Sequence, residues 1–184
     1  MGSRLFRLGL IVGRFQPLHV GHGEMLDRAL ELCDEVLVFV GSSQESGTVN
    51  NPFTYELRRD MIRAVYGDRL LVSPLPDIGV GNNASWGKYV LDSAAARAGF
   101  LPDLFISGTE ARRLSWFSGI EGVSMPALTV PKRIEISAAA LRAMIAEDRF
   151  DEWKAFADPA IHEMYPVLRG AVLAANGGTH TASL

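Results

Sequence analysis

The sequence is short of several residue types, and each shortage excludes a class of protein. Cys33 is the only cysteine among 184 residues, so no disulfide can form within the chain. A signal peptide and apolar runs of membrane-spanning length are both missing, which predicts a cytoplasmic protein without a membrane partner. Three lysines stand against fifteen arginines and the net charge is −3, so no overall basic field favours a nucleic-acid partner.

The remaining composition is typical of a globular domain. Hydrophobic residues make up 48% of the sequence, which has no low-complexity tract. We expect a single domain over residues 1–176, with a short lead-in over residues 1–7, and a disordered polar tail over residues 177–184. Cys33 falls on the apolar side of an expected helix, where it acts as a small buried hydrophobe.

The most informative stretch, Gly13–His22, reads Gly-Arg-Phe-Gln-Pro-Leu-His-Val-Gly-His. A glycine at the end of the apolar run 8–12 lets a phosphate approach the backbone. A helix that begins at about residue 20 aims its free N–H groups and its positive dipole end at the preceding loop. His19 and His22 are three residues apart, so both imidazoles can face one small volume. This arrangement suits polyphosphate chemistry, in which cations stabilise developing charge.

A bare His-x-x-His would more often be an incidental surface pair on a strand-turn-helix unit. Here Gly13, Phe15, Pro17 and Gly21 accompany the histidines at fixed spacing. The run therefore resembles the G-x-F-x-P-x-H-x-G-H signature of the nucleotidyltransferase superfamily with a Rossmann-like fold.

Apolar runs alternate with helical patterns along the chain, which predicts an α/β protein with a parallel sheet in a three-layer sandwich. The resemblance implies five strands in the order 3-2-1-4-5, a ligand crevice over their carboxyl ends and closing C-terminal helices. The expected strands are 8–12, 35–40, 70–75, 104–107 and 123–130, the last an edge strand because it contains Pro126. Expected helices follow the first three strands, and others cover 138–146, 147–156 and 159–175.

The stretch from Gly41 to Thr54 narrows the resemblance. Its sequence, Gly-Ser-Ser-Gln-Glu-Ser-Gly-Thr-Val-Asn-Asn-Pro-Phe-Thr, resembles the corresponding segment of the archaeal-type nicotinamide mononucleotide (NMN) adenylyltransferases. A surface turn would explain its polarity, but its place after a parallel strand favours ligand binding. Thr54 is expected to cap a helix. We assign Arg58, Arg59 and Arg63 on that helix to a solvated or oligomer-facing surface.

A second element, Asn83-Ala84-Ser85-Trp86, resembles the family's Asn-Ala-x-Trp, whose Asn and Trp contact the nicotinamide of NMN. A tryptophan at a helix start is most often core packing, yet an aromatic plane beside an amide can also bind a carboxamide-bearing ring. The resemblance thus implies an acceptor site at Asn83 and Trp86, with Asp77, Ile78 and Ser42 nearby. The intervening loop is longer than in the family pattern, which alters the pocket.

Two segments resemble the superfamily's second signature: residues 106–112 and residues 136–142. The signature should follow the fifth strand and begin a helix, and Ser137 is a good N-cap for residues 138–146. We therefore assign it to residues 136–142. Ala139 stands where the family has Thr, so a hydroxyl expected near the ATP phosphates is missing. Thr109, from the other string, is a candidate replacement across the crevice.

Carried over residue by residue, the resemblance implies adenylyl transfer from ATP to NMN, with Mg²⁺ on the phosphate oxygens and no side-chain nucleophile. An exposed surface arginine is the alternative for Arg142. The implied catalytic residues are Arg14, His19, His22 and Arg142, and the implied ATP-binding residues are Gly13, Phe15, Gly21, Gly108, Thr109, Ile136 and Ser137.

Two other functions stay open from the sequence. The acceptor could be another phosphorylated or phosphonate small molecule, or the donor CTP. Because of Ala139, the chain could also be a nucleotide-binding protein without turnover, although binding alone would not require both histidines. Assembly into a homo-oligomer is an expectation from the family alone.

Overall fold

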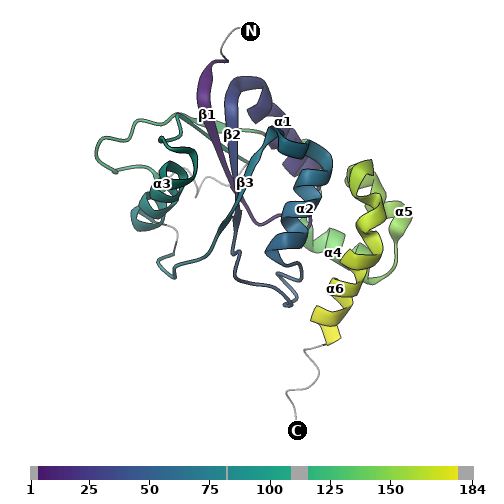
Figure 1. Cartoon of the computed structure of the whole chain (residues 1–184). Coiled ribbons are helices and arrows are strands. Elements are labelled where there is room, and N and C mark those ends of the chain that lie inside the picture. The colour runs from purple at the N-terminus through teal and green to yellow at the C-terminus, as the bar shows by residue number, and fades with distance from the viewer. Residues whose placement is uncertain (1–3, 82, 109–115, 178–184) are drawn as a thin grey trace.

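The core of the fold is a parallel five-stranded sheet (Figure 1). The computed structural model describes residues 4–81, 83–108 and 116–177. The strand order β3-β2-β1-β4-β5, with every neighbouring pair parallel, confirms the predicted topology. The strands are β1 (Phe6–Gly13), β2 (Cys33–Gly41), β3 (Leu71–Leu75), β4 (Leu104–Ser107) and β5 (Ala127–Thr129).

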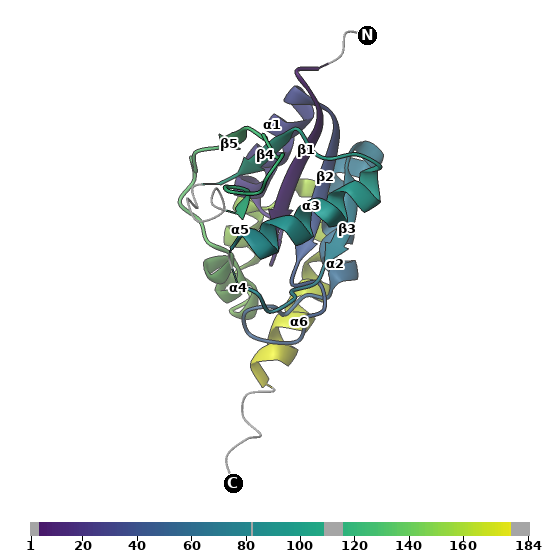
Figure 2. The ribbon, with the colours of Figure 1, turned by 90° about the vertical axis from the view of Figure 1, so that its left-hand side faces the viewer.

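Helices cover both faces of this sheet. Figures 1 and 2 show α3 on one face, α1 and α2 on the other, and the C-terminal helices α4 to α6 beyond α1 and α2. The helices are α1 (Val20–Leu32), α2 (Tyr55–Tyr66), α3 (Ala84–Ala98), α4 (Ala138–Ala146), α5 (Phe150–Trp153) and α6 (Tyr165–Gly177). Short 3-10 helices cover Gly67–Arg69, Lys154–Phe156 and Pro159–Met164, so the expected helix over 159–175 is α-helical only from Tyr165.

Alternate residues of the central strands feed two separate cores. Leu10 of β1 and Phe39 of β2 belong to the core beneath α3. Their neighbours Ile11 and Val38 belong to the core beneath α1, α2 and the C-terminal helices. Because successive strand residues point to opposite faces, a sheet covered on both sides needs continuous apolar strands, which is the pattern that the sequence contains.

Several predicted boundaries were wrong, among them those of β5, which covers only Ala127–Thr129 of the expected 123–130. Cys33 is buried as expected, but it is the first residue of β2, because its extended backbone pairs with Phe6 directly after α1 ends. Burial raises the pKa of its thiol to about 11, so the thiol is unreactive. β1 begins at Phe6 because the Asp103 carboxylate accepts hydrogen bonds from the next two backbone N–H groups. α6 continues through Gly177, and the rest of the expected tail, residues 178–184, lies outside the described residues.

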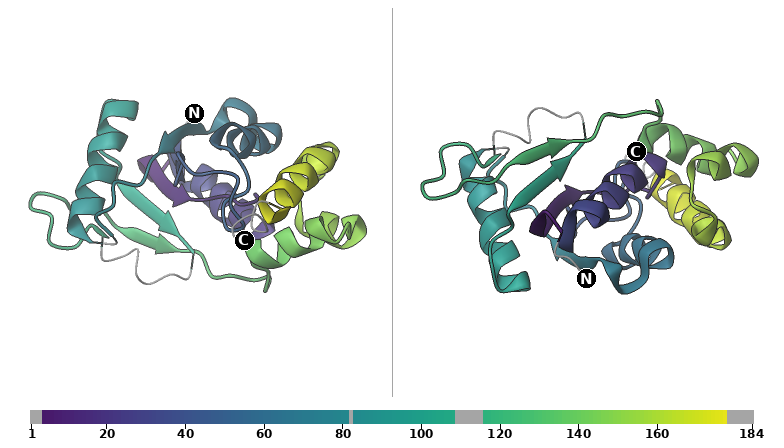
Figure 3. Two further views of the ribbon diagram at one scale, coloured as in Figure 1. Left: turned by 90° about the horizontal axis from the view of Figure 1, so that it is seen from below. Right: turned by 90° about the horizontal axis from the view of Figure 1, so that it is seen from above.

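The carboxyl ends of the strands share one edge of the sheet, which Figure 3 (left) views from below. The segments that follow β2 and β3 are joined there, because the Ser43 N–H donates to the Leu75 carbonyl at 3.4 Å. The segments after β1, β2 and β3 are therefore side by side where parallel sheets bind ligands.

None of the helices in the described ranges has both the length and the apolar character needed to cross a bilayer.

Gly87 sets how closely α3 approaches the chain around Trp116. A methyl group at Gly87 would lie 1.9 Å from the Trp116 carbonyl oxygen, so we expect Gly87→Ala to displace α3. The expected loss in free energy of unfolding, measured by urea denaturation, is roughly 3 kcal/mol. In the matched control Gly170→Ala on α6, no described atom lies within 4 Å of the added methyl group, and helix propensity should raise stability by roughly 0.5–1 kcal/mol. Equal stabilities for the two variants would contradict the described packing.

Candidate functional site

The loop after β1 has a backbone shape that needs its particular residues. Phe15 has a left-handed φ of 52° and a buried ring. A methyl group at Gly13 would meet that ring at 2.9 Å, so glycine permits the ring to fold back under the strand end. Arg14, between them, is exposed. The loop thus buries its aromatic residue and presents its cation outward.

Two distant segments anchor this loop. The buried Gln16 side chain donates to the Phe53 carbonyl and accepts from the Phe53 N–H, both at 3.0 Å. The Gln16 carbonyl in turn accepts from Nη1 of Arg142 at 2.9 Å. Each partner therefore holds the loop through a backbone or amide group, which leaves the exposed Arg14 side chain for other contacts. No local signal in the sequence identifies Phe53 as a partner of Gln16.

His19 is the N-cap of α1. Its Nδ1 accepts from the Gly21 N–H at 3.1 Å, so the neutral ring carries its proton on Nε2. A methyl group at Gly21 would lie 3.1 Å from the His19 ring, which explains a small residue there. Burial first, and then the charge of Lys132, lower the pKa of His19 to about 4. At neutral pH His19 is an uncharged hydrogen-bond donor, not the cation that the sequence suggested.

His22 lies against His19, one turn into α1. The two ring centroids are 3.9 Å apart, and the His22 centroid is 4.7 Å from that of Phe15. The expectation that both imidazoles face one volume is therefore consistent with the ring geometry.

The string 136–142 begins α4 as expected. Ser137 caps the helix by accepting from the Ala140 N–H at 3.1 Å, and Ile136 is buried beside it. Arg142 is half-buried on the next turn and reaches the loop after β1. Burial first, and then the charge of Arg14, lower the pKa of Arg142. Neither arginine forms an ion pair within the described ranges, so an anion is the ligand that this pair suits.

The competing string begins at the end of β4. Gly108 follows Ser107 directly, and a methyl group there would lie 3.8 Å from Met25 Sδ of α1. Thr109 and the rest of that string, residues 109–112, lie outside the described residues.

On the other side of the edge, the loops after β2 and β3 are tied together. Ser42 has a left-handed φ of 46°, and its hydroxyl donates to Asp77 Oδ2 at 2.6 Å. The Asp77 N–H donates to Gln44 Oε1 at 3.0 Å. Ile78, next to Asp77, is 46% exposed. Ser42, Asp77 and Ile78 are thus brought together, as an acceptor site would require.

Asn83 and Trp86 have structural tasks of their own. Asn83 Oδ1 caps α3 by accepting from the N–H groups of Ser85 and Trp86, and Nδ2 donates to the Val80 carbonyl at 2.6 Å. Among the described residues, no acceptor is found for the second Nδ2–H. Trp86 is 7% exposed and packs edge-on against Trp116, so the core-packing alternative describes most of its ring.

Arg58 is the clearest correction to the expected surface. It is fully buried in α2, with its guanidinium bonded to backbone carbonyls, whereas Arg63 is exposed. A signal was present, because Arg58 precedes the buried Met61 and Ile62 by three and four residues and therefore shares their helix face. Charge alone had suggested the opposite.

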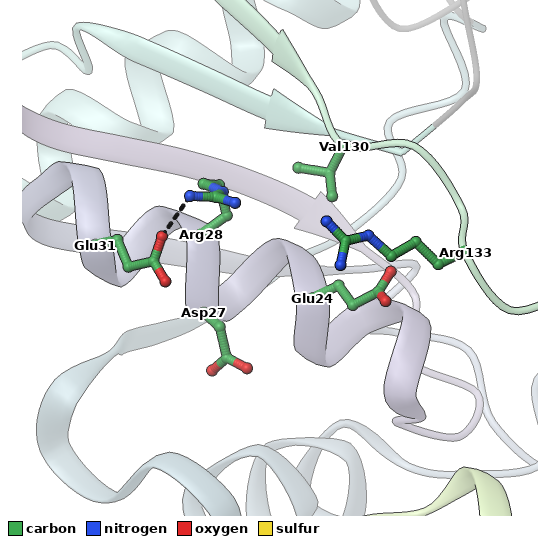
Figure 4. Close-up of a pocket in the computed structure, with 6 residues that line it drawn as sticks. All are labelled: Glu24, Asp27, Arg28, Glu31, Val130 and Arg133. Carbon is green, nitrogen blue, oxygen red and sulfur yellow. Dashed lines mark hydrogen bonds and ion pairs between the residues drawn. The ribbon is translucent and has the colours of Figure 1, made fainter.

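A separate hollow lies on the flank of α1, where Arg133 extends over the helix from the segment after β5 (Figure 4). Its other lining residues are Glu24, Asp27, Arg28, Glu31 and Val130. One guanidinium is already paired, since Arg28 Nη1 lies 2.5 Å from Glu31 Oε2. The hollow has more carboxylates than guanidiniums and therefore does not suit a polyphosphate, which leaves the loop after β1 as the candidate phosphate site.

Sequence comparisons relate the chain to nucleotidyltransferases. A model of the cytidylyltransferase-like family matches residues 10–114. The nicotinamide-nucleotide adenylyltransferase of Saccharolobus solfataricus is 47% identical over 88 residues, which are 45% of this chain and 50% of that protein. The enzyme of the same name from Pyrococcus abyssi is 46% identical over 87 residues, 45% of this chain and 46% of that protein. The matched part of the chain spans about half the length of these curated relatives.

Solved structures show the same fold at low identity. A bifunctional NMN adenylyltransferase/ADP ribose pyrophosphatase from Francisella tularensis superposes with a TM-score of 0.76 at 19% identity, over 94% of this chain and 54% of that one. A NadR protein in complex with NAD and AMP-PNP gives a TM-score of 0.55 at 16% identity, over 88% of this chain and 47% of that one. These likenesses confirm the Rossmann-like architecture.

The lowered pKa of His19 predicts how stability depends on pH. The imidazole titrates near 6.5 when unfolded and at about 4 when folded, so the unfolded chain binds more protons between these values. The free energy of unfolding should therefore fall as the pH drops from 6.5 to 4, by up to roughly 3 kcal/mol from this residue. His19→Asn keeps a capping acceptor without the titration, and urea denaturation at pH 7 and pH 4.5 should show a smaller fall for it. Parallel losses in the two proteins would refute the assignment.

Proposed function

The chain belongs to the cytidylyltransferase-like family, and on that premise we propose that it joins ATP to NMN, giving NAD and pyrophosphate. The observation that carries the proposal is the pair of imidazoles at the start of α1, with ring centroids 3.9 Å apart, beside a loop that contains Arg14 and is bonded by Arg142. Arg14, His19, His22 and Arg142 are the groups concerned. The archaeal relatives, named as nicotinamide-nucleotide adenylyltransferases, support NMN as acceptor and ATP as donor.

The proposed reaction needs no nucleophile from the protein. An oxygen of the NMN phosphate attacks the α-phosphorus of ATP in line, the bond from that phosphorus to the bridging oxygen breaks, and pyrophosphate leaves with the electron pair. Arg14 and Arg142 stabilise the charge on the transferred and departing phosphates. His19 donates Nε2–H as a neutral group, and His22 acts on the same oxygens from beside it. The positive dipole end of α1 adds to this field.

We propose Mg²⁺ as the ion that accompanies ATP. In the described ranges, no three His, Cys, Asp or Glu side chains are grouped to hold a metal, and the candidate phosphate site is made of imidazoles and guanidiniums. This donor set suits phosphate oxygens and does not suit a protein-held Mg²⁺, which prefers oxygen ligands and water. When bound through the substrate, the ion would neutralise phosphate charge.

For the acceptor, we propose that the second Nδ2–H of Asn83 binds the carboxamide oxygen of the nicotinamide ring. The Oδ1 atom is occupied by two backbone N–H groups, so Asn83 can only donate to the ligand. The linked Ser42, Asp77 and Ile78 form the neighbouring wall.

A pyrophosphate-release assay tests the proposed function. The chain is mixed with Mg²⁺ and either ATP or CTP, against NMN, nicotinic acid mononucleotide and other phosphorylated acceptors. We expect ATP with NMN to be the best pair and NAD to appear with the pyrophosphate. His22→Ala should lower kcat roughly 100-fold in a folded protein, as for other preorganised donors. If no combination of nucleotide and acceptor releases pyrophosphate, the chain is a nucleotide-binding protein without turnover. An unchanged kcat in His22→Ala would contradict the catalytic role of His22.

The acceptor contact can be tested without damaging α3. Asn83→Ser keeps a good N-cap but loses the amide donor, so we expect the KM for NMN to rise about tenfold while the KM for ATP stays the same. Nicotinic acid mononucleotide should be affected equally, because a donated N–H binds a carboxylate or a carboxamide oxygen alike. Steady-state kinetics with each substrate varied in turn measures this. An unchanged KM for NMN would place the ring elsewhere.

A further inference from the structure

Arg58 uses all of its hydrogen-bonding capacity on the backbone. A guanidinium has five N–H groups, and five carbonyl oxygens surround this one. Nε donates to Thr54 at 3.2 Å, Nη1 to Arg14 at 3.1 Å and Gly41 at 2.8 Å, and Nη2 to Ser42 at 3.2 Å and Glu45 at 3.5 Å.

These carbonyls belong to both halves of the candidate site. The Arg14 carbonyl lies in the loop after β1, with the groups that we assign to ATP. The Gly41 and Ser42 carbonyls begin the loop after β2, whose Ser42 hydroxyl bonds Asp77 on the acceptor side. One side chain of α2 therefore fixes the spacing between the two loops.

The same contacts stabilise two unfavourable backbone conformations. Phe15 and Ser42 both have left-handed φ values, 52° and 46°, which are unfavourable for a residue with a side chain. Arg58 bonds the carbonyl of the peptide group just before Phe15 and the carbonyl of Ser42 itself. Its position matches the two points where the loops depart from ordinary geometry.

The charge of Arg58 also fits this task. It lies beneath the loops, fully buried, and in the described ranges no carboxylate forms an ion pair with it. Burial lowers the pKa of Arg58, and the nearby positive charge of Arg14 lowers it further, yet a guanidinium stays protonated in proteins. A lysine would offer three donors from a single atom and could not reach the same five oxygens.

We propose that Arg58 is a positioning residue for the transfer reaction, which holds the Arg14 loop and the Ser42 loop at the spacing that aligns donor and acceptor. The inference rests on the proposed function. It acts through Arg14 and Ser42 and touches no substrate itself. Misalignment of the reacting phosphates should lower kcat more than it raises the KM of either substrate.

Arg58→Lys is the principal test, with Arg63→Lys on the exposed side of the same helix as matched control. We expect Arg58→Lys to fold, as followed by thermal melting, and to lose roughly 100-fold in kcat with both KM values within about threefold of the parent. Arg63→Lys should match the parent. A folded Arg58→Lys with parental kcat would overturn the proposal.

A double-mutant cycle separates positioning from general loosening of the fold. In an Arg14→Ala background, one of the two groups through which Arg58 acts is already missing, so the loss in kcat caused by Arg58→Lys should be clearly smaller than 100-fold. Losses that multiply in full would show that Arg58 does not act through Arg14 and would count against the proposal. Arg58→Gln serves as the second variant. Failure of both Arg58 variants to fold would also overturn it, because Arg58 would then be needed for the whole structure.

Hydrogen exchange supplies a readout that does not depend on turnover. Arg58→Lys should speed amide exchange in residues 14–19 and 42–48 and leave α3 unchanged, whereas uniform or unchanged exchange would refute the local role. If the parent releases no pyrophosphate from ATP and NMN, the proposed function fails on its own. The exchange result then still decides whether Arg58 fixes the loops.

Discussion

The parallel pairing of β1 with β2 is the constraint on which the site depends. Gly13 lies opposite Val40 in this register, so the two strands end together and their loops leave the sheet side by side. A shift by one residue would turn every apolar side chain of one strand to the other face, and both cores resist that. The burial of two faces thus fixes where the two loops leave the sheet, and the hydrogen bonds of Arg58 then link these loops.

The parallel sheet could be predicted because its signal is local, whereas the strand order was implied by the family resemblance. Continuous apolar strands indicate a parallel sheet, and the spacing of glycine, proline and histidine in residues 13–22 indicates a phosphate-facing turn. The exact ends of helices and strands could not be predicted as well from the sequence. Cys33 joins a strand instead of a helix because of its pairing with Phe6, a residue far away in the sequence.

The missed parts of the site depend on contacts between distant segments. Gln16 meets Phe53, and Arg142 meets Gln16, across 37 and 126 residues. Arg58 was misassigned because a charged residue on a helix is usually solvated, and the carbonyls that surround it become visible only when the loops are in place. His19 shows the same limit, since its role as a cap and its burial change the protonation state that the chemistry can use.

The junction between α1 and β2 has no connecting residue, because the helix ends at Leu32 and the strand begins at Cys33. An insertion there would have to shift either a packed helix or the central strand register. At the opposite edge, residues 76–83 separate β3 from α3. Change in chain length is therefore easier to accommodate at that edge, where a loop can be remodelled while the folding core stays the same.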